Sequence, residues 1–374
     1  NKRIVLNYIR ARAPISRAEI ARETSLQRST VSAIVDDLIL EGLIEEIGSG
    51  ESTGGRKPTL LQLRRGTPAA IGVDVAPRET TIALADLNGT ILQSEVFPTS
   101  ADIDFMNRQI LAKVRRYAHD NKDADLQVGM CVPGIADQST GNIVYIPYFQ
   151  WSNWDIAARI TDATGLPVIV DNDANAVALA ELWFGAEEIR RTRNFIEVLI
   201  SEGIGTGIII DGQVYRGELG AAGEFGHMFV GTNAPVACSC GRHDCWEAHA
   251  SEKAIVQRYA SGNGKPGTAV DIEHLIELAL SGEKRALAVV RDTATYIGLG
   301  ISNLMIGFSP QAVVISGTIV RAWDLIKDNI QEIASRSIRH HVDTTRIVPS
   351  ELGDKPTILG SVTLVLSRRF TAAG

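Results

Sequence analysis

The chain has 374 residues, of which 45% are hydrophobic and 22% are charged, and its formal net charge is −7. This length exceeds that of one typical core and predicts two or three domains of ordinary globular composition. No apolar run reaches the roughly 18 residues of a membrane-spanning helix, so we expect no membrane partner. Residues 1–66 hold eleven Lys and Arg against eight Asp and Glu, whereas the remainder holds 26 against 36. A basic first module on an acidic body predicts a polyanion partner for the first module alone.

The first 66 residues follow the pattern of a winged helix-turn-helix domain. Apolar spacing predicts a helix over 3–12, ended by Pro14, and a second helix over 17–23 that begins with a capping box of Ser16 and Glu19. A third helix, over 27–41, has apolar residues at i, i+3, i+4 and i+7. Two strands then flank a glycine-rich loop, the wing, and they span 43–47 and 59–63.

The polar residues of this domain suit double-stranded DNA. Side chains that read base edges and contact phosphates stand at the start of the third helix and in the wing. They are Gln27, Arg28, Ser29, Thr30 and Ser32 on the helix, and Arg56 and Lys57 in the wing. The alternative is a small protein-interaction domain with a solvated charged loop, which the basic wing and the polar helix start both disfavour.

The rest of the chain contains one strand pattern twice. From Ala69 and again from Phe195 it reads strand, loop, strand, tight turn and strand, with Asn-Gly and Asp-Gly as the turns. Helical patterns follow both copies, at 104–120, 154–164, 252–260, 271–281, 283–304 and 321–336. We therefore expect two α/β lobes, 67–190 and 191–374, in the actin-like (ribonuclease H-like, sugar-kinase type) fold with a cleft between them. A C-terminal helix is expected to pack back on the first lobe.

In that architecture the first loop of each copy binds nucleotide phosphates through backbone N–H groups, which favours glycine. The second copy is glycine-rich at 203–207, but in the first copy Pro77 has no N–H to donate and Glu79 repels phosphate. The residues that keep the pattern, as vestiges of nucleotide loops, are Asp74, Gly205, Thr206 and Gly207. We expect no tight ATP binding.

A polar segment, Asp-Asn-Asp-Ala-Asn at 171–175, ends a strand and opens an alanine-rich helix. The carboxyl end of a strand is where α/β sheets bind ligands. Asp173 is suited to accept a proton from a hydroxyl, and Asn172, Glu224 and Glu247 are suited to bond several hydroxyls of a polyol. The alternative is that the segment only caps the helix, which requires one such side chain rather than three.

Two tryptophans and one cysteine have open roles. Trp151 and Trp154 are candidates for stacking on a sugar, with packing as the alternative for at least one of them. Cys131 is predicted to be a buried strand thiol.

One histidine and three cysteines fall within nineteen residues. Sulfur and imidazole ligands suit a tetrahedral Zn²⁺ with no open position, which is a structural ion. Core cysteines or a disulfide are the alternative, but two of the cysteines are one residue apart, a poor geometry for bridging each other. The predicted ligands are His227, Cys238, Cys240 and Cys245, with His243 as a rival to His227. Such an ion would fix the loop that carries Glu224 and Glu247.

These motifs resemble those of the ROK family, named for repressors, open reading frames and sugar kinases, and the resemblance covers nearly the whole chain. Its most specific parts are Glu224-Phe-Gly-His227, Cys238-x-Cys240-Gly-x-x-x-Cys245-x-Glu247, Asn172-Asp173-Ala-Asn and Gly205-Thr-Gly. The resemblance implies zinc on His227 and the three cysteines, and a sugar on Asn172, Asp173, Glu224, His227 and Glu247. The general base of the family's kinases matches Asp173. Asp244 departs from the glycine that usually precedes the last cysteine.

The lost first phosphate loop, of which only Asp74 remains, and the added winged helix resemble the repressor branch, similar to the xylose and N-acetylglucosamine operon regulators. That implies a sugar-responsive repressor of carbohydrate-utilisation genes, with no catalytic residue in use, acting as a homodimer or tetramer on operator DNA. The cysteine usage favours a reducing cytoplasm. Two alternatives stay open: an ATP-dependent sugar kinase that retains a DNA-binding domain, and a sugar-binding protein whose first domain docks onto another protein.

Overall fold

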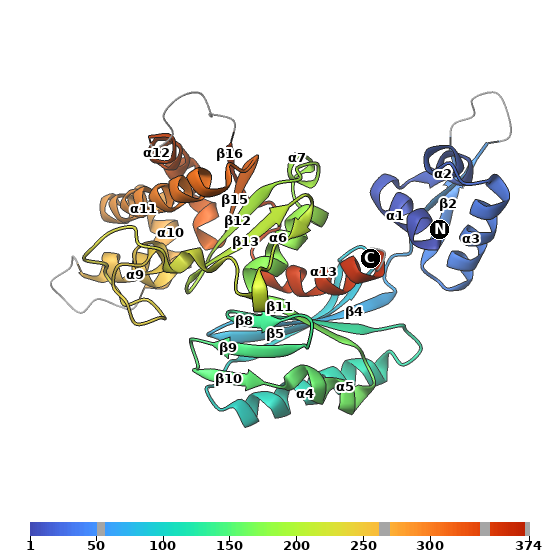
Figure 1. The fold of residues 1–374 in the computed structure, drawn as a ribbon, viewed down its shortest axis with the longest axis horizontal. Coiled ribbons are helices and arrows are strands. Elements are labelled where there is room, and N and C mark those ends of the chain that lie inside the picture. Colours follow the sequence, from blue (N-terminus) through green and yellow to red (C-terminus); the bar gives the residue numbers. More distant parts are fainter. Residues whose placement is uncertain (51–56, 262–269, 337–344, 371–374) are drawn as a thin grey trace.

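The computed structural model describes residues 1–50, 57–261, 270–336 and 345–370 (Figure 1). The N-terminal part is a winged helix-turn-helix domain, as the sequence predicts. The predicted capping box forms, because the Ser16 hydroxyl accepts from the Glu19 N–H and the Glu19 carboxylate accepts from the Ser16 N–H. The elements are α1 (Lys2–Arg12), β1 (Ile15–Ser16), α2 (Arg17–Thr24), α3 (Arg28–Leu40), β2 (Ile44–Ser49) and β3 (Thr59–Leu63), with the strands in the order β1-β3-β2. The short strand β1 was not expected from the sequence.

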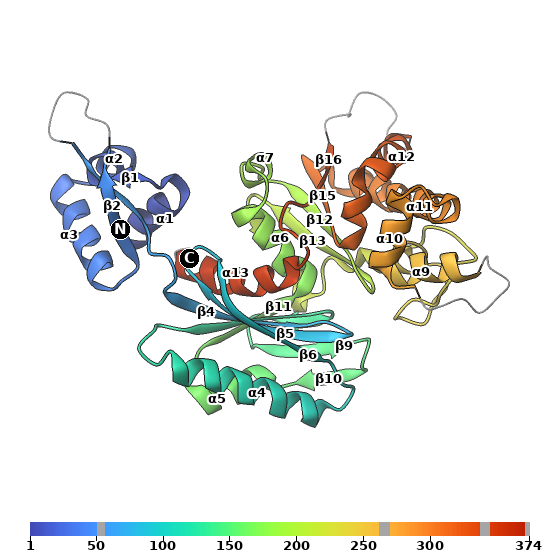
Figure 2. The same ribbon diagram turned by 180° about the vertical axis from the view of Figure 1, so that it is seen from behind.

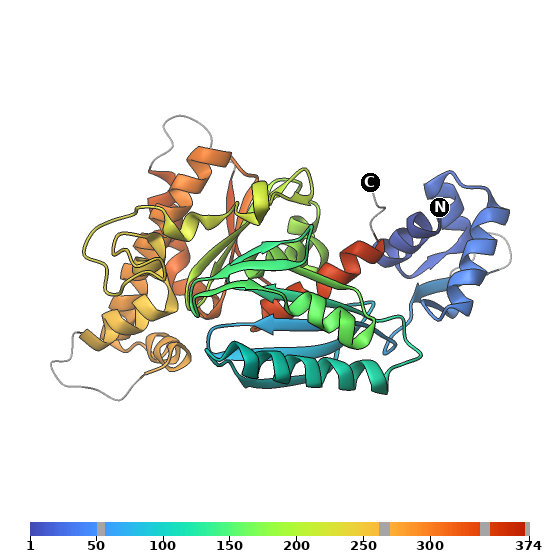
Figure 3. The ribbon, with the colours of Figure 1, turned by 60° about the horizontal axis from the view of Figure 1, so that its bottom comes forward.

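The first α/β lobe is built on a five-stranded sheet of order β11-β7-β4-β5-β6. β4 (Pro68–Val75), β5 (Glu79–Asp86) and β6 (Ile91–Pro98) form an antiparallel meander, which β7 (Gln127–Val132) and β11 (Val168–Asn172) extend in parallel. The helices α4 (Ile103–Asp120) and α5 (Ile156–Thr164) cover one face of this sheet (Figure 3). A small sheet flanks it, of order β10-β9-β8, with β8 (Ile135–Asp137), β9 (Asn142–Ile146) and β10 (Trp151–Trp154).

The second lobe repeats the plan in a sheet of order β14-β13-β12-β15-β16. Its meander is β12 (Phe195–Ile200), β13 (Ile204–Ile210) and β14 (Gln213–Val214), and β15 (Ala312–Ser316) and β16 (Arg346–Pro349) add in parallel. The two identical strand orders confirm the duplicated pattern and the actin-like fold. The helices of this lobe are η1 (Glu218–Gly220), η2 (Glu224–His227), α8 (Trp246–Ala250), α9 (Glu252–Ser261), α10 (Ile272–Leu280), α11 (Lys284–Phe308), η3 (Thr318–Ala322) and α12 (Trp323–Ser335), and the short helix α7 (Glu187–Arg190) precedes it.

Two helices lie between the sheets. α6 (Asp173–Phe184) packs on β12 and β13, and α13 (Pro356–Phe370) packs on β4, β7 and α6 (Figure 2). Gly129 in β7 permits this approach, since a Cβ there would lie 1.9 Å from the Ser361 carbonyl oxygen of α13. The end of α13 also contacts α1, where the Asn7 amide donates to the Phe370 carbonyl. In the described part of the chain, no helix is both long and apolar enough to cross a bilayer.

Candidate functional site

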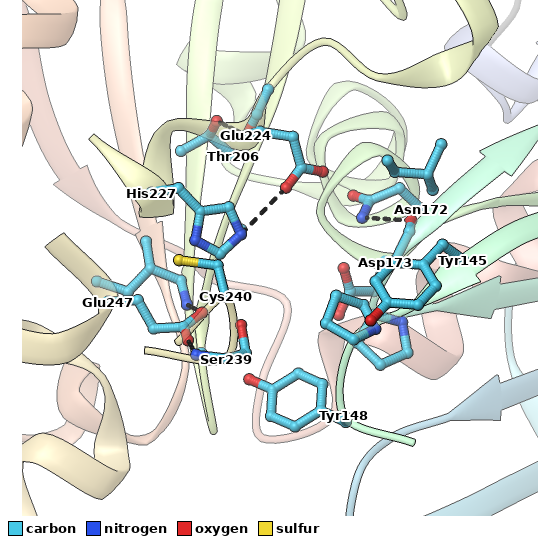
Figure 4. A pocket seen from close by; sticks show the side chains of 18 of the residues that line it. Tyr145, Tyr148, Asn172, Asp173, Thr206, Glu224, His227, Ser239, Cys240 and Glu247 are labelled. Carbon is cyan, nitrogen blue, oxygen red and sulfur yellow. Dashed lines mark hydrogen bonds and ion pairs between the residues drawn. The ribbon is translucent and has the colours of Figure 1, made fainter. Parts of the chain in front are cut away.

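A cavity of about 640 Å³ lies between the two lobes, where the first loops of both meanders and the start of α6 converge (Figure 4). It brings together all five residues predicted to bind a sugar. Those residues are Asn172, Asp173, Glu224, His227 and Glu247. They come from three separate parts of the sequence, and the fold unites them.

Asn172 and Asp173 stand where β11 ends and α6 begins. The Asn172 side chain caps α6, because its Oδ1 accepts from the Asn175 N–H at 3.2 Å while its Nδ2 donates to the Gly134 carbonyl at 3.1 Å. The capping alternative therefore holds for Asn172, which also lines the cavity. Asp173 accepts from the Ala174 N–H at 2.8 Å. Burial, together with the nearby carboxylates of Asp74 and Glu224, raises the pKa of Asp173 to about 7. An aspartate of this kind is suited to exchange a proton at neutral pH.

Asp171, the buried neighbour in this segment, has a structural role. Its Oδ2 accepts from Nε and Nη2 of Arg216 at 2.8 and 2.7 Å and from the Gln138 amide at 3.2 Å. Arg216 follows β14, so this ion pair ties the second sheet to the end of β11. The side chain of Asp171 is 1% exposed, and a carboxylate so buried requires such partners.

His227 connects the cavity to the cysteine cluster. The short helix η2 places its Nε2 at 3.4 Å from Oε2 of Glu224 and its Nδ1 at 3.1 Å from Sγ of Cys238. The ring therefore directs Nε2 toward Glu224 in the cavity and Nδ1 toward the cysteine cluster. Gly223, which precedes η2 at φ +92°, has the Thr206 carbonyl 2.3 Å from where a Cβ would stand, so glycine is required there.

The four predicted metal ligands form one cluster: the nitrogen and sulfur donors of His227, Cys238, Cys240 and Cys245 all lie within 4.8 Å of one another. Sγ of Cys240 is 3.4 Å from Sγ of Cys238 and 3.6 Å from Sγ of Cys245, and all three cysteines are free of disulfides. Tetrahedral Zn–S bonds of about 2.3 Å separate sulfurs by about 3.8 Å. The donor set and spacing thus fit a four-coordinate zinc ion. His243 is exposed and outside the cluster, so His227 is the histidine of this set.

Glu247 joins this cluster to the cavity. It lies in α8, directly after Cys245 and Trp246, and is 6% exposed. Its Oε1 accepts from the Ser239 N–H at 2.8 Å, and its Oε2 accepts from the Ile204 N–H at 3.4 Å. The orientation of Glu247 therefore depends on the shape of the cysteine loop.

The aromatic residues of the cavity are tyrosines, and the expectation of sugar stacking on tryptophan is wrong. Trp151 and Trp154 are 6% and 1% exposed, and their indole N–H groups donate to the Ala101 carbonyl and to Asn107. Both belong to the buried hydrophobic cluster of the first lobe. Tyr145 and Tyr148 line the cavity instead. Tyr145 lies in β9 and Tyr148 follows it, in a segment whose sequence carries no motif, so only the fold reveals them.

Tyr148 has an unusual position for a tyrosine. Its hydroxyl is buried and has no hydrogen-bond partner among the described residues. A Cβ on Gly203 would lie 2.4 Å from this hydroxyl and 2.5 Å from Oε2 of Glu247, so glycine is needed for both to reach the cavity. Burial and the carboxylates of Glu247 and Asp173 raise the pKa of Tyr148, which stays a neutral donor.

The expected second phosphate loop is largely a strand. Gly205, Thr206 and Gly207 lie in β13, and a Cβ on Gly207 would stand 2.3 Å from the Ala174 carbonyl of α6. Glycine there allows close helix packing, and the loop proper is limited to 201–203. Thr206 donates to the Gly223 carbonyl at 2.6 Å.

Asp74 and the first loop are engaged with protein groups. Asp74 is 8% exposed and accepts from Thr357 and Cys131, and burial raises its pKa to about 6. Cys131 is buried, as expected. In the loop after β4, Arg78 forms an ion pair with Glu202, which joins the first loops of the two meanders across the cleft.

The candidate DNA-contacting residues lie at the start of α3 and beside the wing. Gln27 is the N-cap of α3 and makes no capping hydrogen bond with its side chain. Gln27, Arg28 and Ser29 are exposed, and Thr30 and Ser32 are half-buried. Lys57 is exposed before β3, and Arg56 lies outside the described residues.

The body of the chain, residues 70–368, matches the ROK family. The chain belongs to the ROK family. Residues 2–52 of this ROK protein match the MarR family. The xylose repressor of Bacillus spizizenii is 33% identical over 371 residues, which cover 98% of this chain and 94% of that protein. NagC of Escherichia coli, a DNA-binding transcriptional dual regulator, is 29% identical over 378 residues, covering 98% of this chain and 92% of NagC.

Two solved structures place this ROK protein within the family. A ROK family transcriptional regulator, a homolog of the E. coli MLC protein, has a TM-score of 0.81 at 26% identity and covers 99% of this chain and 96% of its own. A ROK glucokinase from Streptomyces griseus, in complex with glucose and AMPPNP, has a TM-score of 0.69 at 26% identity and covers 79% and 98%. The regulator matches the winged helix as well as the lobes, and the two relatives are a repressor and a transcriptional dual regulator. The chain is therefore a transcriptional regulator of the ROK family.

Asp244, where the family usually has glycine, is accommodated without strain. It is not among the described residues with positive φ, and its two carboxylate oxygens accept from Arg242 at 3.0 and 3.1 Å. The departure leaves the cysteine cluster intact.

Proposed function

We propose that this ROK regulator is a sugar-responsive repressor of carbohydrate-utilisation genes, in which a monosaccharide bound between the lobes changes the affinity of the winged helix for operator DNA. The observation that carries the proposal is the convergence of five polar side chains in one interlobe cavity of a chain that begins with a winged helix. A cavity of about 300–1,000 Å³ with a few convergent polar groups suits a small ligand.

The side chains of the cavity supply the groups that a sugar needs. The carboxylates of Asp173, Glu224 and Glu247 accept hydrogen bonds from hydroxyls, and Nε2 of His227 and the Tyr148 hydroxyl are available as donors. Asp173 and Tyr148 belong to the first lobe, and the other three belong to the second. A sugar that forms hydrogen bonds with residues of both lobes binds more tightly at one separation of the lobes. This difference in affinity between two conformations is what a ligand-driven conformational change requires.

We propose a structural Zn²⁺ on His227, Cys238, Cys240 and Cys245. Such an ion supplies a fixed loop shape and no reactive position, because four protein ligands complete its coordination. The chain's own groups then act: the Ser239 N–H holds Glu247, and the His227 ring, fixed through Nδ1, directs Nε2 toward Glu224.

We also propose that the chain does not act as a kinase. Pro77 leaves the first loop without one N–H donor, and the Arg78–Glu202 ion pair joins the two loops where a phosphate chain would enter. A coupled assay for ADP release with a panel of sugars tests this. Turnover above background would restore the kinase alternative.

The partners follow from the same proposal. We propose double-stranded operator DNA as the partner of Gln27, Arg28, Ser29, Thr30, Ser32, Arg56 and Lys57, a homodimer or tetramer as the binding species, and the cytoplasm as the compartment, where thiolates stay reduced. We keep the division into 1–66, 67–190 and 191–374, supported by a separate main sheet in each part, with α13 returning to the main sheet of the first lobe.

The sugar site is tested by titrating the full-length protein with a monosaccharide panel in a calorimeter. Asp173→Asn should weaken binding of the best sugar about 10- to 100-fold, because a carboxylate acceptor is lost from a buried site. Asp162→Asn, on the exposed side of α5, is the matched control and should bind normally. Equal affinity of both variants would refute Asp173 as a ligand.

A further inference from the structure

A second cavity, of about 710 Å³, lies between the winged-helix domain and the body. Its walls come from α1, from the segment after β3, and from the end of α6 with α7. It is remote from the interlobe cavity, with which it shares no lining residue. None of the residues proposed to bind the sugar lines it.

This cavity is lined by five arginines and one carboxylate. The arginines are Arg10, Arg12, Arg65, Arg190 and Arg191, and the carboxylate is Glu187. Glu187 is already paired with Arg191 at 2.5 Å. Arg12, Arg65 and Arg190 have no carboxylate partner among the described residues. The cavity therefore holds a clear excess of positive charge, contributed by both the winged-helix domain and the body.

Arg10 shows that this charge is incompletely compensated. Its guanidinium lies 3.9 Å from the centre of the Trp183 ring, which fixes its position through a cation–π contact. Its Nε is buried and has no hydrogen-bond partner among the described residues. Burial and the charge of Arg190 lower the pKa of Arg10 to about 10. Like charges from the two parts of the molecule thus face each other here, an arrangement that an anion would stabilise.

The position of the cavity separates it from the DNA-reading surface. α1 faces the body, whereas α3 lies on the opposite side of the winged-helix domain in both views (Figures 1 and 2). Operator DNA read by the start of α3 does not occupy the same side as Arg10. The cavity has the volume for a small ligand rather than a duplex.

We propose that this cavity is a binding site for a small phosphorylated anion, held by Arg10 and Arg12 of α1, Arg65 of the connecting segment and Arg190 of α7. Guanidinium groups match phosphate oxygens in charge and geometry. An anion that contacts both α1 and α7 fixes the orientation of the winged-helix domain on the body. Binding there would give the regulator a second effector site. Only the effect of this anion on DNA affinity rests on the proposed function; binding of the anion does not.

The test uses the full-length protein and inorganic pyrophosphate as the probe, titrated in a calorimeter at constant ionic strength. We expect saturable binding of one pyrophosphate per chain, weakened about tenfold or more by Arg190→Gln and by Arg65→Gln. Arg115→Gln is the matched control, since Arg115 is exposed on α4 in the first lobe and outside the cavity. Melting temperatures of the three variants establish that each is folded.

Absence of pyrophosphate binding, or equal loss of affinity in all three variants, overturns the proposal. If Arg190→Gln and Arg65→Gln lower affinity for DNA of any sequence and pyrophosphate does not bind, the arginines contact the DNA backbone and the proposal is likewise wrong. Because the titration contains no DNA and no sugar, failure of the proposed repressor function would leave its result unchanged.

Discussion

At the scale of single residues, the site depends on side chains that do two things at once. Asn172 caps α6 and lines the cavity, and His227 faces Glu224 with one nitrogen and Cys238 with the other. The sequence predicts the residue types of the site, because carboxylates, amides and cysteines in tight spacing have few other uses. It does not predict that Asp171 pairs with Arg216 or that Tyr148 lines the same cavity as Glu247, because these arrangements join segments that only the fold brings together.

Tyr148 offers the sharpest test at this scale. Tyr148→Phe removes only a hydroxyl that is buried and unpartnered among the described residues, so the free energy of unfolding should be unchanged or rise by up to about 1 kcal/mol. Sugar affinity should fall about tenfold, because the sugar loses a hydrogen bond to the Tyr148 hydroxyl. Tyr145→Phe, in the same cavity but more exposed, is the control. Unchanged sugar affinity in Tyr148→Phe would remove this residue from the site.

Asp173 predicts a pH dependence of stability. Its folded pKa of about 7 lies above the ordinary value of 3.8, so the folded protein binds the extra proton and the free energy of unfolding falls as pH rises from about 4 to about 7. Asp173→Asn removes this loss. Relative to wild type, the free energy of unfolding of the variant should rise by about 1–2 kcal/mol between pH 5 and pH 8. This value is reduced for solvent screening, because the group is partly exposed.

Denaturant titrations at the two pH values measure this difference. Asp162→Asn should show no such gain, since that carboxyl is exposed on α5. A gain that is equal at pH 5 and pH 8 would mean that Asp173 titrates like an exposed aspartate.

At the scale of elements, periodicity predicts the helices and hairpins well, but it assigns the glycines after Gly203 to a loop. The predicted capping box, the turns at Asn88 and Asp211 and the helices of both lobes are present. The sequence favours a loop for the glycines after Gly203, whereas they lie in β13, because their small size is needed where α6 packs on that strand. Packing against a distant helix leaves no signal in local spacing.

The cysteine loop is the element whose integrity we predict the sugar response needs. Cys240→Ser should lower bound zinc from about one per chain to a small fraction, because a thiolate ligand is lost. The melting temperature and the sugar affinity should fall together, since Glu247 is held by the N–H of Ser239. Metal analysis and calorimetry on one preparation measure both.

His243→Ala is the matched variant for this element. It should keep its zinc and its sugar affinity, because His243 is exposed and lies outside the cluster. A metal-free Cys240→Ser variant with normal sugar affinity would contradict the coupling between the loop and the cavity.

At the scale of the whole molecule, three parts meet at α6 and α13. α6 carries Asp173 at its start and Trp183 near its end, where Arg10 of the winged-helix domain stacks. α13 packs on the first sheet and α6, and its last residue, Phe370, accepts from Asn7 of α1. These two helices therefore form a continuous physical connection between the sugar cavity and the DNA-binding domain. The sequence indicates the two lobes and the winged helix, but not this junction, since it consists of contacts between residues up to 363 positions apart.

The most direct measurement is fluorescence anisotropy of the full-length protein on DNA from upstream of its own and neighbouring operons, with and without monosaccharides. We predict tight binding that one sugar weakens about tenfold or more, and loss of binding in Arg28→Ala with sugar affinity retained. DNA affinity that no sugar changes, including a sugar shown by calorimetry to occupy the interlobe cavity, would contradict the central claim that the cavity controls the winged helix.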